Sequence, residues 1–442
     1  MVSAAPATGE KTLGFTSLVC LIIANMIGAG VFTTSGFALG DLGTANRVMA
    51  AWVVGGVIAI CGALSYAGLV RQITESGGEY LFLSRLIHPL AGFIAGWVSL
   101  LAGFTGAIAF AARAFETYAF PTRPDWLPNG AAAAGMVMVA ALLHGIKVQT
   151  GAAAQNFVVF LKVALLIGFL AFSASVALSQ GMAPAPAAMP FSLTVFAGSL
   201  VWISLSYSGF NAAVYVAGEA KDAQRNAPKA LIVGTLIVTV LYIALNAAFV
   251  YLPPFQAVVG QEAVAAAAAQ AIGGTPAALA IRFVTVLALI TSVFSLVMAG
   301  PRVYARMADD GVFPSFFRFG GAGAPTAAIM AQAALAILLI VVSDLRGLLS
   351  YLGFTLSVSA ALTVASLFLI AKREGRAAVA VWGYPFTPAF YVLATLILAA
   401  LAGRRSPIEL LTMIITLVSG SLVYYAFGLH RVAAAQGRAG VR

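Results

Sequence analysis

The chain has 442 residues, of which 62% are hydrophobic and 9% charged, with a mean hydropathy of +1.00. Soluble domains carry about 25% charged residues, so this composition excludes a soluble globular protein and indicates an integral membrane protein. The formal charge of +10 does not indicate a nucleic-acid partner, because the basic residues are scattered through connecting loops and form no patch with interleaved aromatic residues.

Apolar runs long enough to span a bilayer recur along the whole chain. A spanning helix needs about 20 mostly apolar residues, because the hydrocarbon core is about 30 Å thick and each residue rises about 1.5 Å. Twelve runs are predicted, near residues 14–39, 47–70, 89–119, 131–149, 153–179, 192–217, 229–252, 276–301, 326–343, 347–371, 386–402 and 407–429. The first is too long for a cleaved secretory signal. We expect an all-α membrane protein with a single integral domain over 1–442.

The first run contains two glycines at mid-membrane depth, within the stretch NMIGAGVF at 25–32. Each glycine weakens a helix by about 1 kcal/mol relative to alanine. If the helix unwinds at Gly28–Gly30, its outer half begins with free N–H groups and a partial positive charge, which suit a carboxylate. Close helix packing is the alternative, because small residues let backbones approach.

The fifth run holds Lys162, the one basic residue that cannot be assigned to a connecting loop. It lies about seven residues, or roughly 10 Å, past the expected membrane edge near Gln155. Its long side chain can reach most of the way to the membrane surface. A lysine that merely snorkels and a lysine with a function are therefore both compatible with the sequence.

The sixth run contains a polar cluster, LSYSGFN at 205–211, at a depth that matches the glycines of the first run. Gly28 and Ser206 each lie 14 residues into their runs, counted from Gly14 and Ser192. For Tyr207 and Asn211 the alternative is a satisfied interhelical hydrogen bond, and Leu205 is also compatible with core packing.

Two groups of five runs, 14–179 and 192–371, have similar lengths, and the runs of 386–429 follow them. An odd number of helices per repeat inverts the second repeat relative to the first. Interrupted helices at matching positions of two such halves indicate a midplane binding site. The carbonyls of Met26, Ile27, Leu205, Ser206 and Ser208 then converge on an ammonium group opposite the carboxylate, so the frame suits a zwitterion.

Basic residues are distributed unequally between the two sides of the predicted topology. With the N-terminus in the cytoplasm, sixteen Lys and Arg residues lie on that side and seven on the other. This bias follows the positive-inside rule and predicts that both termini are cytoplasmic. Glu219 and Lys221, at the cytoplasmic end of the sixth run, form either an ion-pair network or a solvated turn. The connection 253–275 is expected to be a small outer lid.

Catalytic, metal and cofactor chemistry is not indicated. The three histidines, His88, His144 and His430, lie near different predicted helix ends, and the two cysteines, Cys20 and Cys61, lie inside apolar runs as small buried residues. The Gly28-x-Gly30 pair lacks the third glycine and the strand-to-helix setting of a dinucleotide fingerprint. We therefore predict no enzyme, no metal and no cofactor.

An ordered set of motifs resembles the amino acid, polyamine and organocation superfamily, and most closely its L-type amino acid transporter branch in bacterial form. The motifs are GAGVF at 28–32, SYSGFN at 206–211, GEAK at 218–221, RNAP at 225–228 and ADDGVFP at 308–314. The resemblance implies a five-plus-five inverted repeat (a LeuT-like fold) with helices 1 and 6 discontinuous and two additional C-terminal helices. It also implies alternating access by rocking of helices 1, 2, 6 and 7.

The same resemblance assigns roles to site residues. The substrate carboxylate meets the amides of Ala29, Gly30 and Val31, and the amine meets the carbonyls named above. Gly28, Tyr207 and Asn211 complete the predicted binding residues. Family members often place an aromatic gate where this chain has Leu205, so the gate and the size of the accepted side chain stay open.

Lys162 matches the position at which a lysine, in sodium-independent relatives, replaces the sodium ion of sodium-driven ones. We interpret it as a substitute cation or a protonation switch, in a sodium-independent uniporter or exchanger or in a proton-coupled symporter. Tyr242, Ser292 and Ser295 are its expected hydrogen-bonding partners, and the alternative for each serine is a bond to its own helix.

The resemblance also bears on partners, location and substrate. Eukaryotic L-type transporters bond to a heavy chain through a cysteine between helices 3 and 4, and the segment 120–130 has none, so no disulfide-linked partner is expected. The short tails favour a bacterial inner membrane. A neutral amino acid fits the apolar surroundings best, and a cationic amino acid or polyamine is the alternative, although no acidic residue lies deep in helices 1, 3, 6, 8 or 10. A channel or a sensor without transport would be a different class.

Overall fold

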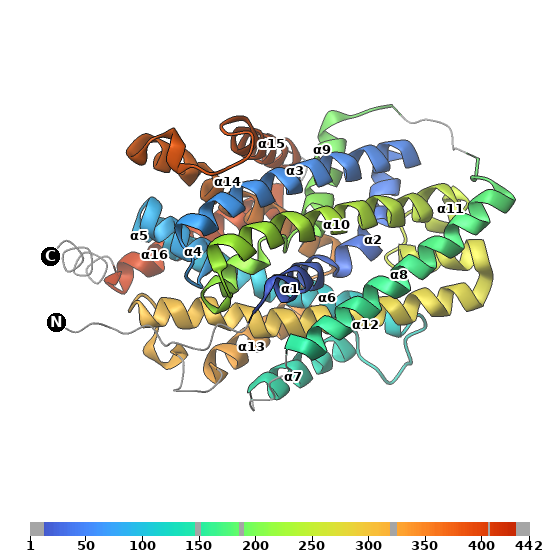
Figure 1. The fold of residues 1–442 in the computed structure, drawn as a ribbon. Helices are drawn as coiled ribbons and strands as arrows, with labels where there is room; N and C mark the ends of the chain where they lie inside the picture. The colour runs from blue at the N-terminus through green and yellow to red at the C-terminus, as the bar shows by residue number, and fades with distance from the viewer. Residues whose placement is uncertain (1–12, 146–151, 185–189, 319–324, 405–406, 430–442) are drawn as a thin grey trace.

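The computed structural model describes residues 13–145, 152–184, 190–318, 325–404 and 407–429. Both termini, which were predicted to be cytoplasmic, lie outside the described residues. The regular structure within them is helical, and most of the long helices run side by side along one direction (Figure 1). The α-helices are α1 (Phe15–Met26), α2 (Ala29–Leu42), α3 (Ala45–Gln72), α4 (Gly78–Leu86), α5 (Pro89–Val98), α6 (Thr105–Ala119), α7 (Ala131–Gly145), α8 (Ala152–Gln180), α9 (Leu193–Ser206), α10 (Ala223–Tyr251), α11 (Phe255–Val258), α12 (Val264–Asp309), α13 (Thr326–Val342), α14 (Leu345–Glu374), α15 (Phe386–Gly403) and α16 (Pro407–Ala426).

Shorter elements of other helical types interrupt or extend these helices. A π-helical turn, η1 (Ser99–Phe104), joins α5 to α6. The 3₁₀ helix η2 (Ala212–Glu219) follows α9 after a turn. Two further 3₁₀ turns, η3 (Ser315–Phe317) and η4 (Arg376–Ala378), lie in connecting segments. Local helix types thus change where η1 and η2 approach the centre of the bundle.

Twelve apolar helical segments match the order of the predicted runs. Among the described residues, seven are long and apolar enough to cross a membrane: Phe15–Leu42, Ala45–Gln72, Pro89–Ala119, Asn156–Gln180, Ala223–Tyr251, Val264–Asp309 and Leu345–Glu374. Five shorter apolar helices are Ala131–Gly145, Leu193–Ser206, Thr326–Val342, Phe386–Leu401 and Leu410–Ala426. Helices satisfy every backbone hydrogen bond internally, which hydrocarbon requires. The prediction of an all-helical integral membrane protein is confirmed.

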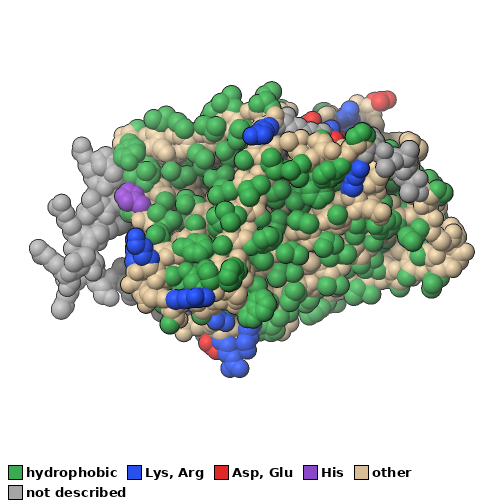
Figure 2. All heavy atoms as spheres, turned by 90° about the horizontal axis from the view of Figure 1, so that it is seen from above, with side chains coloured by type: hydrophobic (Ala, Val, Ile, Leu, Met, Phe, Trp, Pro, Cys, Tyr) green, Lys and Arg blue, Asp and Glu red, His purple; other side chains and the backbone are tan. Residues whose placement is uncertain are grey.

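Large apolar side chains also cover the outside of the bundle. Val240, Phe283 and Val341 are 69%, 65% and 73% exposed, respectively. Figure 2 shows apolar side chains over most of the visible face, with few charged ones among them. In water such a surface is an aggregation hazard, whereas in a bilayer it faces lipid.

The connection 253–275, expected to be a small outer lid, is largely helical. It contains α11 and the first turns of α12, which bends at Gly274, where φ is +65°. That left-handed conformation favours glycine, so the bend is encoded locally. The alanine-rich stretch before Gly274 is consistent with helix, because alanine has the highest helix propensity.

The elements that carry the sequence motifs pack in the middle of the bundle. α1 packs against α10 and α8, α2 packs against α9, and α12 packs along α6. The two predicted interruptions, between α1 and α2 and after α9, are therefore brought to the same place.

Candidate functional site

The first interruption is a break between α1 and α2. Met26 is the last residue of α1, Ala29 is the first residue of α2, and Gly28 between them has extended backbone angles (φ −119°, ψ −152°). The first turn of α2 has no capping side chain, so the amides of Ala29, Gly30 and Val31 lack partners within their own helix. This helix start offers N–H donors and a partial positive charge.

The second interruption follows Ser206, the last residue of α9. Residues 207–211 form a turn, in which Gly209 has a φ of +93°. The carbonyls in the last turn of α9 lie beyond the hydrogen-bonding pattern of the helix. That of Leu205 accepts the amide of Ser208 at 2.9 Å. This end of α9 therefore presents carbonyl oxygens.

The two breaks lie directly against each other. A side chain at Gly30 would place its Cβ 2.6 Å from the Cβ of Ser206, and one at Gly209 would lie 2.9 Å from the carbonyl oxygen of Asn25. The hydroxyls of Thr34 and Ser206 are hydrogen-bonded at 2.9 Å. Interruption and close packing, the two interpretations of the glycines, therefore occur together.

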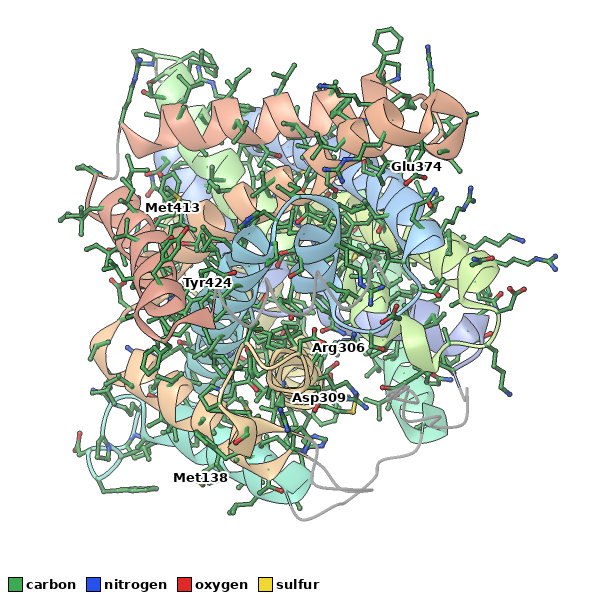
Figure 3. The ribbon with its side chains drawn as sticks, turned by 90° about the vertical axis from the view of Figure 1, so that its left-hand side faces the viewer. Met138, Arg306, Asp309, Glu374, Met413 and Tyr424 are labelled. Carbon is green, nitrogen blue, oxygen red and sulfur yellow. The ribbon has the colours of Figure 1, made fainter. Side chains whose placement is uncertain are left out.

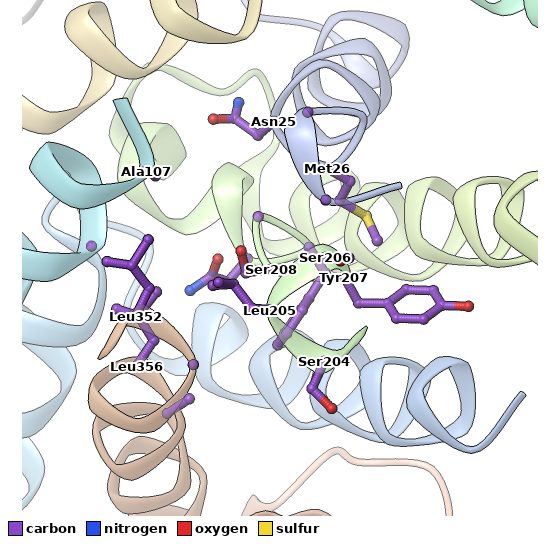
Figure 4. Close-up of a pocket in the computed structure, with 18 of the residues that line it drawn as sticks. Asn25, Met26, Ala107, Ser204, Leu205, Ser206, Tyr207, Ser208, Leu352 and Leu356 are labelled. Atoms are coloured by element: carbon purple, nitrogen blue, oxygen red, sulfur yellow. The ribbon is translucent and has the colours of Figure 1, made fainter. Parts of the chain in front are cut away.

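A cavity of about 170 Å³ lies beside the two breaks (Figure 4). Ten of the predicted residues line it: Met26, Gly28, Ala29, Gly30, Leu205, Ser206, Tyr207, Ser208, Asn211 and Ser292. Ile27 and Val31 are fully buried beside it. The structure thus brings most of the predicted binding residues together, while their roles stay predictions.

The cavity has an apolar wall opposite α9. Leu352 and Leu356 of α14 and Phe104 of η1 contribute to it. Figure 4 shows Leu205 extending toward the two α14 leucines, whereas the ring of Tyr207 points away. The Tyr207 hydroxyl donates to the carbonyl of a tryptophan in α3 at 3.0 Å. Apolar groups therefore face the cavity at the level of Leu205.

Two side chains from other helices hold the carbonyl end of α1. Lys162 of α8, fully buried, donates from Nζ to the carbonyl of Ile27 at 3.3 Å. Tyr242 of α10 donates its hydroxyl to the carbonyl of Met26, which also accepts the amide of Gly28 at 2.8 Å. The amine of Lys162 thus lies at the carbonyl end of α1, which is the negative end of its dipole.

The two predicted serines of α12 also lie at the α1 break. Ser295 accepts a hydrogen bond from Nδ2 of Asn25 at 3.2 Å, and the hydroxyl of Ser292 lies 3.2 Å from the position of a Cβ added to Gly28. The hydrogen bonds of the described residues do not join Lys162 to these serines. Their role as its partners stays a prediction.

An acidic side chain, not predicted from the sequence, also reaches the cavity. Glu79 of α4 lines it and is 5% exposed. Its carboxylate accepts hydrogen bonds from the hydroxyl of Tyr66, from Nδ2 of Asn211 at 3.3 Å and from Oγ of Ser359 at 3.0 Å. Burial raises the pKa of this carboxyl above its ordinary value, and the hydrogen bonds offset only part of that effect.

The local signal for Glu79 is the glycine pair before it. Gly77 and Gly78 have φ angles of +147° and +57°, and a Cβ on Gly78 would collide with the ring of Tyr215. Only glycine allows both this turn and this close approach. The pair therefore brings α4 against η2 and places Glu79 near Asn211.

Ion pairs join segments at the end of the bundle that includes α4 and η2. Glu219 accepts a hydrogen bond from Nε of Arg302 in α12 at 3.0 Å, a partner that was not predicted, and Lys221 is exposed. Glu75 pairs with Arg85 at 2.5 Å and with Arg306 at 3.3 Å, and the hydrogen bonds from Arg85 lower the pKa of Glu75. Figure 3 views this end directly, with Arg306 on α12 near the middle.

A further ion pair joins α2 to α14. Asp41 in the last turn of α2 pairs with Arg346 in the first turn of α14 at 3.1 Å. The guanidinium of Arg346 also lies 5.0 Å from the ring centroid of Trp202 in α9. Both interrupted helices are therefore tied to neighbours beyond the cavity.

Within the part of the chain that the structure describes, no group of three or more His, Cys, Asp or Glu side chains is placed to hold a metal ion. Cys20 and Cys61 are free thiols. The polar groups of the cavity are amides, carbonyls, hydroxyls and one carboxylate, which suit binding by hydrogen bonds.

The fold and the site define a helical membrane protein with a small cavity framed by two interrupted helices. The profile of the amino acid permease family matches residues 13–426, and the chain belongs to that family. The resemblance to the amino acid, polyamine and organocation superfamily is thereby confirmed, and the relatives that follow show a distant similarity to L-type transporters.

Several animal proteins are similar to the chain. The b(0,+)-type amino acid transporter 1 of Oryctolagus cuniculus is 28% identical over 254 residues, which cover 54% of this chain and 51% of that protein. The Asc-type amino acid transporter 1 of Homo sapiens is 25% identical, covering 83% of this chain and 72% of that protein. The large neutral amino acids transporter small subunit 2 of Rattus norvegicus is 25% identical, with 83% and 71% covered. The chain thus aligns with about half the length of the first of these relatives.

Proposed function

We propose that the chain is a secondary active transporter that moves a neutral amino acid across the membrane by alternating access. The observation that carries the proposal is the contact between two interrupted helices at a small cavity, in a member of the amino acid permease family. The names of the similar proteins, which include amino acid transporters and a transporter of large neutral amino acids, support the substrate class.

In the proposed bound state, backbone dipoles hold both ends of the amino acid. The carboxylate meets the amides of Ala29, Gly30 and Val31 at the positive end of α2. The carbonyls of Met26 and Ile27 already accept bonds from Tyr242 and Lys162. The amine therefore binds chiefly to the carbonyls at the end of α9 and in the turn after it, those of Ser206 and Ser208, together with that of Leu205, which also accepts the amide of Ser208.

The substrate side chain extends toward the apolar wall. Leu205, Leu352 and Leu356 offer no charge and no hydrogen-bonding group at that position. A buried polar or charged side chain without a partner is costly, so this wall favours an apolar one. Leucine in place of the aromatic gate leaves room for a bulkier side chain.

Lys162 supports sodium independence. Its ammonium lies at the carbonyl end of α1, against the oxygen of Ile27. When protonated, this amine repels a second cation and offsets the negative end of the helix dipole. We therefore assign Lys162 the role that a sodium ion has in sodium-driven carriers.

The proposal includes the architecture expected from the sequence. Twelve transmembrane helices form a five-plus-five inverted repeat, 14–179 and 192–371, followed by two helices in 386–429. The first, second, sixth and seventh spans, which are α1–α2, α3, α9–η2 and α10, rock against the remaining helices. Both termini lie in the cytoplasm, an orientation supported by the positive-inside bias. The proposed location is a bacterial inner membrane.

Uptake of labelled amino acids into proteoliposomes tests the proposal. We expect saturable uptake of neutral amino acids, exchange with preloaded substrate, and no change when sodium is replaced by choline. A channel would show neither saturation nor exchange, and a sensor would bind the amino acid without flux. Either result would overturn the assignment as a carrier.

A cationic amino acid or a polyamine is the alternative substrate. The observation that favours it is the carboxylate of Glu79, which lines the cavity without a basic partner among the described residues. Competition by arginine, lysine and putrescine against labelled leucine distinguishes the two. Stronger competition by these compounds than by unlabelled leucine would favour the alternative.

A further inference from the structure

Glu79 is an acidic group that lines the cavity, and among the described residues no basic side chain pairs with it. The side chain is 5% exposed, and its three hydrogen-bond donors, Tyr66, Asn211 and Ser359, are all neutral. An ionised carboxylate in such a place costs several kcal/mol unless a cation or a proton neutralises it. An ionised Glu79 is therefore stable in this place only with a bound cation, and a bound proton removes its charge.

The titratable groups that face Glu79 are tyrosines. Tyr66 of α3, Tyr215 of η2 and Tyr391 of α15 lie close enough to feel the charge of an ionised Glu79. α4 packs against α5, α12, α14 and η2, and the basic residues near it are engaged elsewhere. Arg85 and Arg306 bind Glu75, Arg302 binds Glu219, and Arg373 of α14 donates to the carbonyl of Leu86.

We propose that Glu79 is the proton-binding site that couples this carrier to a proton gradient. The inference rests on the proposed function and names its coupling ion. A proton from water on the outer side binds to the carboxylate while the amino acid is bound in the cavity. The same proton leaves to the cytoplasm after the cavity opens there, so each cycle moves one proton and one amino acid and no bond of the substrate changes.

The geometry accommodates both protonation states in place. Oε1 accepts bonds from Tyr66 and Asn211, whereas Oε2 accepts only the hydroxyl of Ser359 within the described contacts. A proton on Oε2 can be donated to Ser359, because a hydroxyl both donates and accepts. The two bonds to Oε1 remain. Protonation therefore removes the charge without breaking the cluster.

The cluster connects Glu79 to moving and static parts of the proposed carrier. Asn211 belongs to the turn after α9, Tyr66 to α3 and Ser359 to α14. An ionised Glu79 binds the amide of Asn211 more strongly than a neutral one, because charge-assisted hydrogen bonds are about twice as strong. The charge on Glu79 therefore changes the strength of the hydrogen bond that holds the turn after α9.

The observations favour a proton over a cationic substrate as the ligand. A carboxylate offers about four acceptor positions, and three are filled here. The remaining exposure of 5% admits a proton more readily than an ammonium group with its hydration shell. Lys162, the buried amine at the α1 break, is not among the residues that line the cavity.

Accumulation driven by a pH gradient tests the inference in proteoliposomes clamped at zero membrane potential. One proton per amino acid gives about tenfold accumulation of labelled leucine for one pH unit, because that unit is a tenfold proton ratio. Glu79→Gln keeps the shape and mimics the protonated state. We expect this variant to exchange leucine but not to accumulate it, so that the ratio of internal to external leucine stays at about one.

The controls separate this inference from the proposed function. Glu262→Gln, which neutralises an exposed acid outside the cavity, should accumulate leucine as the native protein does. Exchange without gradient-driven accumulation in the native protein, or full accumulation by Glu79→Gln, would overturn the proton site and leave the carrier intact. Absence of leucine exchange in the native protein would overturn the proposed function instead.

Infrared difference spectra of the native protein between low and high pH give a second readout that needs no transport. We expect a carboxylic acid band that shifts in Glu79→Asp and is lost in Glu79→Gln. If Glu79→Gln does not fold, the shift of the band between the native protein and Glu79→Asp still tests whether Glu79 binds the proton. A band unaffected by the Asp substitution, or tight binding of arginine that requires Glu79, would overturn the proton assignment.

Discussion

At the residue scale, Gly30 is the contact that holds the two breaks together. Replacing it with leucine would force a Cβ to within 2.6 Å of the Cβ of Ser206. Overpacking of this kind costs about 1–3 kcal/mol, and here it separates the amides from the carbonyls that share the substrate. We expect Gly30→Leu to insert in the membrane and to lose amino acid binding, measured by scintillation proximity on purified protein.

Gly168→Leu is the matched control for this prediction. Gly168 lies in α8, and a Cβ added there meets no atom within 4 Å. The same change of residue type at a membrane-embedded glycine should therefore leave binding unchanged. Normal binding by Gly30→Leu would remove the proposed site.

Lys162 is the second residue whose replacement is informative. Hydrogen bonds to charged groups contribute about 1.5–3 kcal/mol, and that of Lys162 fixes the carbonyl of Ile27 at the break. Lys162→Met should lower the initial rate of leucine uptake by at least about tenfold. Lys229→Met, at an exposed lysine of α10, is the control. Uptake by the native protein that requires sodium would contradict the assigned role.

Single residues also show what the sequence could not predict. Asn25 and Glu79 both line the cavity, but neither was predicted to do so. Asn25 donates to Ser295, 270 positions away in the chain, and Glu79 accepts from Ser359, 280 positions away. No local pattern encodes such pairs. Glu79 also follows a polar, glycine-containing stretch that reads as a loop.

At the element scale, the two interruptions were predictable because each places small or polar residues inside an otherwise apolar run. The glycines at 28–30 and the cluster at 205–211 lie at the α1–α2 break and the turn after α9. The π-helical turn η1 and the early start of α12 at Val264 were not predicted. Their apolar and alanine-rich sequences fit several helix types and lengths equally well.

Ion pairs between elements provide a test of the proposed rocking motion. The ion pair between Glu219 and Arg302 joins η2, which continues the sixth span, to α12, the eighth span, at one end of the bundle. Partly exposed pairs contribute about 0.2–1 kcal/mol, so Glu219→Gln should favour the open state by up to about fivefold. The measurement is the rate at which a maleimide labels Leu356→Cys from the cytoplasmic side, in a chain without Cys20 and Cys61.

Glu374→Gln serves as the comparison for this measurement. Glu374 lies at the end of α14, exposed on the face of the molecule that Figure 3 shows. Its neutralisation changes the net charge by the same amount without touching the pair. Equal labelling rates in the two variants would show that the Glu219–Arg302 pair does not restrain opening.

At the scale of the whole molecule, ion pairs at both ends of the bundle enclose the cavity. Arg302–Glu219 and Arg346–Asp41 each join an interrupted helix, or its continuation, to a long neighbour. Alternating access requires that only one end of the bundle opens at a time. Two weak ion pairs, one on each side of the cavity, suit this mechanism better than a permanent pore. The apolar outer surface leaves the bundle free to move within lipid.

The orientation of the whole chain is the remaining prediction of the topology. Arg123 and Lys221 are both exposed, and the three apolar helices α7, α8 and α9 lie between them in the sequence. An odd number of spans puts the two residues on opposite sides of the membrane, and the positive-inside rule puts Lys221 in the cytoplasm. In a chain without Cys20 and Cys61, an impermeant maleimide should label Arg123→Cys in intact cells. It should reach Lys221→Cys only after permeabilisation. Labelling of both in intact cells would contradict the span count, and the reverse pattern would contradict the orientation while leaving the count unchanged.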